Sequence, residues 1–490
     1  MKKDSKTLRL MIGLLALLVC MPMNAYDFEC DGIYYDIKED HELTVVAGDN
    51  KYQGEVVIPN EVTINDKTYS VTEVGELAFY NCTSLTSISI PNSVTKIGYA
   101  SFAGCSGMVS ISIPNSVTTI VYGAFNSCSS LTSITIPSSV THIGPDAFGH
   151  CDNLATIEVE SGNQYYDSRD NCNAIIETSS NTLISGCKNT MIPDNITSIY
   201  MCAFAGCRDM KSVNIPQSVT SIGTCAFASC VSLTSVTIPS GVKAIEDYVF
   251  HNCSSLTSVT IPDGVVSIGT RAFAGCSSLS SIAIPNSVSE YGDGVFADCT
   301  SLTSISIPSD VTFLGFATFR GCTSLTSVTL PNNIGSYLSG TFQDCSSLIS
   351  VSLPNSVTHI ASFAFHGCSS LSSITIPNGV TFIKSGAFYG CNSLTMIVSE
   401  IEKPFELDNA VFSEDNYHTA ELIVPKGTKS LYQTTNGWKQ FAKITEATTD
   451  LRAITTPSDP TAIFDLQGRR LTDKPQKGIY IQNGKKYVVR

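Results

Sequence analysis

Residues 78–97 have the sequence AFYNCTSLTSISIPNSVTKI. The pattern A-F-x-x-C-x-x-L-x-x-I-x-I-P-x-x-V-x-x-I in this stretch returns every 23 residues over most of the chain. Thirteen cysteines keep the period, and each follows a phenylalanine by three places. They are Cys82, Cys105, Cys128, Cys151, Cys207, Cys230, Cys253, Cys276, Cys299, Cys322, Cys345, Cys368 and Cys391. A repeat this regular predicts one small structural unit that is stacked many times.

Each unit contains a short strand. Because successive side chains of a strand point to opposite faces, Ile88 and Ile90 should point to the interior. Ser87 and Ser89 should then face solvent, and Pro91 should end the strand. The strands of successive units are expected to form one long parallel sheet.

The rest of the unit returns the chain to the next strand. Val94 and Ile97 should point back to the interior, Phe79 should begin a short helical or 3₁₀ turn, and Cys82 should lie beneath it. One coil cannot bury these residues alone, whereas a stack closes a continuous core. A period of roughly 20 to 29 residues with L-x-x-I-x-I is typical of a leucine-rich repeat, so we expect a right-handed, mostly β solenoid.

The composition agrees with a folded, acidic protein. Of 490 residues, 43% are hydrophobic and 15% are charged, which is enough apolar material for a core. The net charge of −14 repels the phosphate backbone, so nucleic-acid binding is not expected.

The N-terminus has the order of a secretory signal. Basic residues within 2–9 precede the apolar run Leu10–Cys20 and the small residue Ala25. We expect a signal peptide over residues 1–25, cleaved after Ala25. The run is much shorter than the roughly 20 residues that span a bilayer, so the mature protein should have no membrane helix. Cys20 could instead carry a lipid, although Val19 is larger than that processing prefers.

The repeat resembles that of the BspA-like leucine-rich repeat proteins, which are exported or surface-attached proteins of host-associated microbes. The resemblance covers roughly residues 75–400. Residues 26–74 resemble the family's N-terminal β cap, and residues 401–447 resemble its C-terminal cap. The resemblance implies that the protein is secreted or located at the cell surface and that it adheres to an extracellular or host protein or glycan.

The last residues differ from the repeats. Residues 448–462 are rich in Thr, Ser, Pro and Asp, as in a linker. Residues 463–490 alternate apolar and polar side chains, contain the turn signal Asn483-Gly484, and carry seven Lys or Arg. We expect a small β module there.

An insertion at about residues 160–190 breaks the period, because Cys151 and Cys207 are 56 residues apart. The sequence predicts a hairpin centred on residues 179–180, which makes Cys172 and Cys187 a possible disulfide if the strands pair symmetrically. Cys202 and Cys225 are a second possible disulfide, since each lies just before an Ala-Phe pair of adjacent coils.

Enzymatic chemistry finds little support. The periodic cysteines occupy one slot and are expected to pack as small apolar groups. His150 precedes Cys151, but His251 and His366 recur in turns of other coils, which favours variable turn residues over a cysteine nucleophile. The histidines are scattered and no phosphate-binding or G-x-S-x-G motif occurs, so no cofactor, metal site or catalytic residue is expected.

The outward strand positions are mainly Ser and Thr. The candidate binding face consists of Ser133, Thr135, Ser235, Thr237, Ser258, Thr260, Ser304, Ser306, Ser327 and Thr329, and we call it the hydroxyl face. One interpretation is ordinary sheet chemistry, in which hydroxyls bond across strands. The other is a polar platform for a protein or glycan, with weak binding per coil. The functional hypotheses are therefore a binding protein, a spacer without a specific ligand, or an enzyme only if the insertion hides a site.

Overall fold

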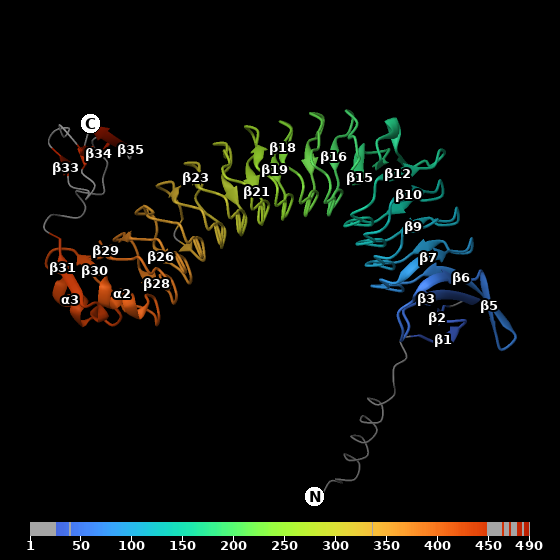
Figure 1. Cartoon of the computed structure of the whole chain (residues 1–490), viewed down its shortest axis with the longest axis horizontal. Helices are drawn as coiled ribbons and strands as arrows, with labels where there is room; N and C mark the ends of the chain where they lie inside the picture. Colours follow the sequence, from blue (N-terminus) through green and yellow to red (C-terminus); the bar gives the residue numbers. More distant parts are fainter. Residues whose placement is uncertain are drawn as a thin grey trace, which may run out of the picture. The chain divides into compact units, whose positions relative to one another are not determined.

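The computed structural model describes residues 26–38, 41–335 and 337–447, and the backbone of four strands between residues 463 and 489. The predicted signal peptide and the predicted linker lie outside the described residues. The chain divides into two compact units, residues 1–233 and 234–490, which are described separately below. Within each unit, coils lie one upon the next (Figure 1).

The first unit begins with a β sheet. It contains β1 (Phe28–Cys30), β2 (Ile33–Ile37), β3 (Glu42–Val46), β5 (Glu61–Ile64) and β6 (Lys67–Val74). β1, β2 and β3 pair antiparallel, whereas β6 pairs parallel with β3. The ring of Tyr52, between β3 and β4, lies 4.5 Å from the ring of Phe79 with planes tilted by 39°, and β6 pairs with β8 of the first coil, so this region covers that coil. It thereby keeps the end of the core from water.

The strand expected at L-x-x-I-x-I is present, and we call its parallel pairings the first ladder. In the first unit it contains β4 (Gly54–Val57), β7 (Leu85–Ser89), β10 (Ser133–Ile136) and β12 (Thr156–Val159). β4 pairs with β7 and β10 pairs with β12, both parallel. Ile88 and Ile90 are buried, as the alternation predicts.

A second ladder runs through the V-x-x-I position, where the sequence predicted only a return path. In the first unit it contains β6, β8 (Lys96–Ile97), β9 (Thr119–Ile120) and β11 (His142–Ile143). All three pairings are parallel. Each coil can therefore bond its neighbour on two sides.

The insertion is built into the second ladder. It contains β13 (Tyr166–Asp167), the 3₁₀ turn η2 (Arg169–Asn171), β14 (Ala174–Glu177) and β15 (Thr182–Gly186). β14 and β15 form an antiparallel hairpin, and β15 pairs parallel with β16 (Ser198–Ile199), which pairs with β17 (Ser221–Ile222). The hairpin thus replaces one ladder strand and does not form a free loop.

The second unit repeats the two ladders. Its first ladder contains β18 (Ser235–Thr237), β20 (Ser258–Thr260), β23 (Ser304–Ser306), β24 (Ser327–Thr329), β27 (Ser373–Ile376) and β29 (Met396–Ser399). Its second ladder contains β19 (Ala244–Ile245), β21 (Ser267–Ile268), β22 (Glu290–Tyr291), β25 (Tyr337–Leu338), β26 (His359–Ile360) and β28 (Phe382–Ile383). Every pairing between these strands is parallel.

A stack of phenylalanines forms the centre of each unit's core. Phe296 and Phe319 are fully buried, with ring centroids 5.9 Å apart and planes 4° apart. We call the thirteen periodic cysteines the column cysteines. Residues two places before these rings and one place before the column cysteines have positive φ, for example Ala317 at 54° and Gly321 at 73°. Two left-handed residues per coil make the turn around each ring tight. The solenoid predicted from the sequence is confirmed.

The second unit ends in a cap. It contains the helices α2 (Glu414–Thr419) and α3 (Lys429–Thr434), the 3₁₀ turn η3 (Trp438–Gln440), and the strands β30 (Glu421–Val424) and β31 (Lys443–Glu446). β30 and β31 continue the parallel pairing from β29. The ring of Phe412 stacks 5.1 Å from that of Phe388, and the buried Trp438 donates its indole N–H to Phe405 O at 2.9 Å. These contacts close the core.

Residues 463–489 contain a separate small sheet. Its strands are β32 (Ile463–Phe464), β33 (Arg470–Leu471), β34 (Gly478–Gln482) and β35 (Lys485–Val489). All pairings are antiparallel, and Gln482 faces Lys485 across the hairpin. The Asn483-Gly484 turn itself lies outside the described residues.

Candidate functional site

The hydroxyl face is exposed and in register. All ten residues chosen from the sequence are exposed. In the second unit Ser235 lies opposite Ser258 and Thr237 opposite Thr260. The same register joins β23 to β24, where Ser304 faces Ser327 and Ser306 faces Thr329. In the first unit Ser133 and Thr135 face Thr156 and Glu158 of β12. The structure therefore brings the predicted residues together in aligned rows.

Other Ser and Thr side chains bind the backbone of the preceding coil. Thr326 donates its hydroxyl to Thr303 O at 3.1 Å, from the position four places after a column cysteine. Thr118, directly before β9 of the second ladder, does the same to Thr95 O at 3.3 Å. Each donor lies 23 residues after its acceptor. The sequence pattern did not distinguish these structural hydroxyls from outward strand hydroxyls, because only the coil-to-coil register reveals the acceptor.

The ten hydroxyls of the hydroxyl face make no such bond: within the described residues, none of them has a side-chain hydrogen-bond partner. A surface hydroxyl without an internal partner is bound to water and can exchange it for a ligand. The face is uncharged at β23 and β24. Its last strand is β24, whereas at the cap Met396 is exposed and the Lys443 ammonium lies 2.7 Å from the Glu421 carboxylate.

The column cysteines are buried, and most of them donate a hydrogen bond to the preceding coil. All thirteen are buried, and the Sγ of Cys322 lies 3.1 Å from Phe296 O of the preceding coil. The same thiol-to-carbonyl contact recurs for Cys105 with Phe79 and for Cys299 with Phe273. The sequence predicted packing alone. A carbonyl already bonded within its own turn offers its second lone pair to the thiol.

Ionisation of these cysteines is unfavourable. Burial raises the pKa of Cys322 and of Cys151 to about 12. Burial also lowers the pKa of His150, which immediately precedes Cys151. An activated cysteine–histidine pair needs both shifts in the opposite direction, with a thiolate beside an imidazolium. His251 and His366 lie two places before their column cysteines, not one, and Nδ1 of His366 is 3.6 Å from the Asp344 carboxylate.

The structure does not contain the predicted Cys172–Cys187 disulfide. A β-bulge between Ile175 and Ile176 shifts the hairpin register by one residue, so Ala174 pairs with Gly186. The symmetric register assumed from the sequence is therefore wrong beyond the bulge. Both thiols are buried and free, and Cys187 Sγ lies 3.5 Å from Asn173 O. Continuing the shifted register would place Cys187 opposite Asn173.

Cys202 and Cys225 lie next to one another in the first unit. Both are half-buried, and both have left-handed backbone conformations, with φ of 57° and 58°. A side-chain hydrogen bond with Cys225, followed by burial and the charge of Asp146, raises the pKa of the Cys202 thiol. The two side chains are therefore in contact, and the disulfide between them stays a prediction.

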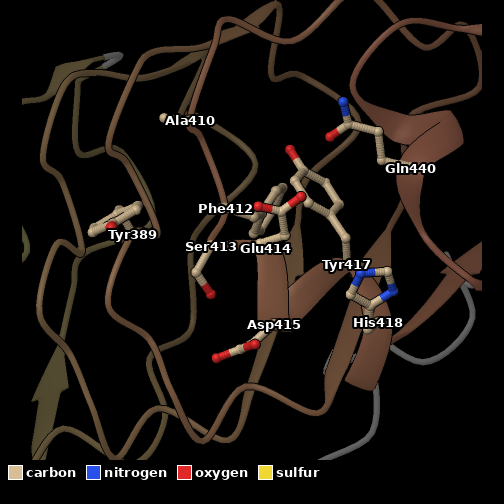
Figure 2. Close-up of a pocket in the computed structure, with 9 residues that line it drawn as sticks. All are labelled: Tyr389, Ala410, Phe412, Ser413, Glu414, Asp415, Tyr417, His418 and Gln440. Carbon is tan, nitrogen blue, oxygen red and sulfur yellow. The ribbon is translucent and has the colours of Figure 1, made fainter.

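An open cavity of about 690 Å³ lies on the C-terminal cap, at the start of α2 (Figure 2). Tyr389 lines one side, and His418 and Gln440 line the other. Its remaining lining residues are Ala410, Phe412, Ser413, Glu414, Asp415 and Tyr417. The Ser413 hydroxyl accepts the Asn416 N–H at 3.3 Å, which is the hydrogen bond that caps α2. Sequence analysis missed this cavity because the cap does not follow the repeat.

Among the described residues, no group of three or more His, Cys, Asp or Glu side chains could hold a metal ion. Nor does any helix in that part of the chain have the length and apolar character to cross a membrane.

Known proteins that are similar to this chain share its leucine-rich repeat. A family model for the BspA type leucine-rich repeat region, with 6 copies, matches residues 58–175, 175–303 and 289–419. A leucine-rich repeat protein from Bacteroides ovatus is 26% identical, with a TM-score of 0.45, over 82% of this chain and 100% of its own. A leucine rich cell surface protein from Faecalibacterium prausnitzii is also 26% identical, with a TM-score of 0.46, over 77% and 95%. No curated protein matches the chain in sequence.

Proposed function

The chain belongs to the BspA-type leucine-rich repeat family, and from this premise we propose that it is an exported, non-catalytic binding protein. Its ligand is an extracellular or host macromolecule, a protein or a glycan, which lies along the hydroxyl face. Export by the signal peptide, whether to the medium or the cell surface, belongs to the same proposal. So does adhesion as the biological outcome.

One observation carries the proposal: two sets of hydroxyls with different surroundings. Those of Thr303 and Thr326 bond the preceding coil, and they account for the preference for Thr at their position. Those of Ser304 and Thr329 are exposed on the strands that follow, β23 and β24, and have no such partner among the described residues. Sheet chemistry therefore explains the first set and leaves the second set available.

The chemistry of the face indicates the kind of ligand. A hydroxyl both donates and accepts a hydrogen bond, so rows of Ser and Thr suit the hydroxyls or amides of an extended partner. The face lacks the Tyr, Trp and Arg that dominate energetic hot spots. Binding should be weak per coil and gain strength from the number of coils in contact.

The cysteine environment supports the non-catalytic part. Cys151 and Cys322 are buried donors whose raised pKa keeps them as thiols, so they are poor nucleophiles. No step of the proposed function requires a cofactor.

A second candidate is a spacer without a specific ligand. The monotony of the outward residues favours it, because rows of Ser and Thr recur with little variation from β18 to β24. The two candidates differ in one measurable property, which is saturable binding.

The test uses the purified chain without residues 1–25 on arrays of extracellular-matrix proteins and polysaccharides. The double variant Ser304→Lys, Ser327→Lys places two ammonium groups on the hydroxyl face, and Ser385→Lys makes the same change at an exposed turn position. The proposal expects saturable binding, about tenfold weaker for the double variant and unchanged for Ser385→Lys. No saturable binding supports the spacer, and equal binding by the double variant excludes this face.

A further inference from the structure

We propose that Cys202 and Cys225 join two adjacent coils of the first unit through a disulfide. The inference is separate from the proposed function, because it concerns the turn edge of the coils and not the hydroxyl face.

The backbone places these residues at equivalent points of neighbouring coils. Cys202 N donates to Thr224 O at 3.0 Å, immediately before Cys225. Two residues further along each coil, the rings of Phe204 and Phe227 stack at 5.0 Å with planes 4° apart. Equivalent residues of paired parallel segments are about 4.8 Å apart. That value lies within the Cα separation of about 4.4 to 6.8 Å that a disulfide allows.

The side chains are directed at one another. The hydrogen bond between Cys202 and Cys225 requires the two sulfur atoms to be neighbours in the reduced protein. Both residues are half-buried, so a small oxidant can reach them. Cys225 already has Cys202 as its contact, which a disulfide between the two residues requires.

Other cysteine pairs of the first unit lack this combination. Cys105 and Cys128 are also one coil apart, but both are buried and each thiol is directed at a phenylalanine carbonyl of the preceding coil. Cys172 and Cys187 are buried and out of register. Cys30 is half-buried, and its Sγ lies 3.9 Å from the Asp31 carboxylate. Among the pairs compared, only Cys202 and Cys225 are therefore expected to form a disulfide.

The reaction is a thiol–disulfide exchange with a small-molecule disulfide. One thiol of the pair loses its proton to solvent and attacks a sulfur of oxidised glutathione, which forms a mixed disulfide and releases one glutathione thiolate that takes up a proton. The second protein thiol then attacks the mixed disulfide and releases the other glutathione. The two protein thiols lose two electrons and two protons, which end on two glutathione thiols.

The location gives the bond a mechanical role. Cys202 and Cys225 lie in the first two regular coils after the β14–β15 hairpin, where the repeat resumes. The bond closes a loop one repeat long, and closing a loop restricts the unfolded chain. It should raise the resistance of these two coils to opening.

The experiment uses the chain without residues 1–25, fully reduced and then equilibrated with oxidised glutathione at one pH. Alkylation and peptide mapping without reductant should show Cys202 linked to Cys225, the column cysteines unlinked, and a melting temperature a few degrees above that of the reduced protein. Cys225→Ser should abolish the link, whereas Cys322→Ser should leave it intact.

The mapping of the unaltered chain decides the proposal even if a variant fails to fold. Two separate glutathione adducts on Cys202 and Cys225, or two unmodified thiols after equilibration, would overturn it. A link from either cysteine to a column cysteine would also overturn it, because the assigned register would then be wrong.

Discussion

Replacing Asp146 by asparagine should stabilise the first unit at neutral pH. Asp146 precedes Phe148 by two places, so it occupies the left-handed slot of its coil, with φ of 57°. Its Oδ2 accepts a hydrogen bond from the Asn126 amide at 2.8 Å, whereas its Oδ1 is buried and has no hydrogen-bond partner. Burial raises the pKa of this carboxyl from 3.8 to about 6, and the hydrogen bond from Asn126 offsets only part of that shift.

The shift fixes both the sign and the size of the effect. A carboxyl whose pKa is higher in the folded chain binds its proton more tightly there. The folded chain is therefore most stable, as far as Asp146 is concerned, at low pH, where Asp146 is protonated in both the folded and the unfolded chain. As the pH rises from about 4 to about 6, the unfolded chain loses the proton first and stability falls. Above pH 6 the Asp146 carboxylate is charged in both states, and the full cost of burying that charge lowers the stability of the folded chain. A shift of about two pKa units corresponds to about 3 kcal/mol.

Urea denaturation at pH 4 and pH 7.5 measures the loss of stability that the charged Asp146 causes. Asp146→Asn retains an oxygen that can accept the Asn126 amide and carries no charge, so its midpoint should exceed that of the unaltered chain at pH 7.5. At pH 4 the two midpoints should nearly coincide. Asp194→Asn, at an exposed loop position, is the control for a general change in net charge. Equal stabilisation at both pH values, or the same gain from Asp194→Asn, would refute the argument.

Two further predictions concern hydrogen bonds between coils. Cys322→Ala removes the thiol that contacts Phe296 O and should cost about 1 to 2 kcal/mol in urea, whereas Cys322→Ser keeps a donor and should cost less. Equal losses would show that the thiol contributes volume alone. Thr326→Val removes the bond to Thr303 O and should cost about 0.5 to 1 kcal/mol, whereas Thr329→Val should leave the unfolding free energy unchanged. A similar loss for both variants would remove the distinction between the two sets of hydroxyls.

The strand and core of the coil were predictable from the sequence. Alternation along residues 85–90 correctly placed Ile88 and Ile90 inside, and the spacing placed Val94 and Ile97 there too. These predictions depend on properties that are local to one repeat, namely the period of two in a strand and the need to bury apolar side chains.

The second ladder and the hairpin register were not predictable in the same way. A strand such as β8 has two residues, too few for an alternation that could be recognised in the sequence. The bulge between Ile175 and Ile176 moves every pair beyond it by one position, and hydrophobicity does not reveal where the extra residue falls. Symmetry about residues 179–180 was therefore insufficient to pair Cys172 with Cys187.

Two nearby hydroxyls of one coil can have different roles, and comparison between coils reveals the difference. A residue that bonds the previous coil, such as Thr326, is constrained by the carbonyl 23 residues earlier. A residue that differs from those at the equivalent position of other coils has no such constraint. Cys202 and Cys225 occupy a left-handed slot that holds Gly123 in an earlier coil of their unit, although a side chain there is less favourable than glycine. Repetition thus identifies what the solenoid needs to stack, and the departures identify where this chain adds chemistry of its own.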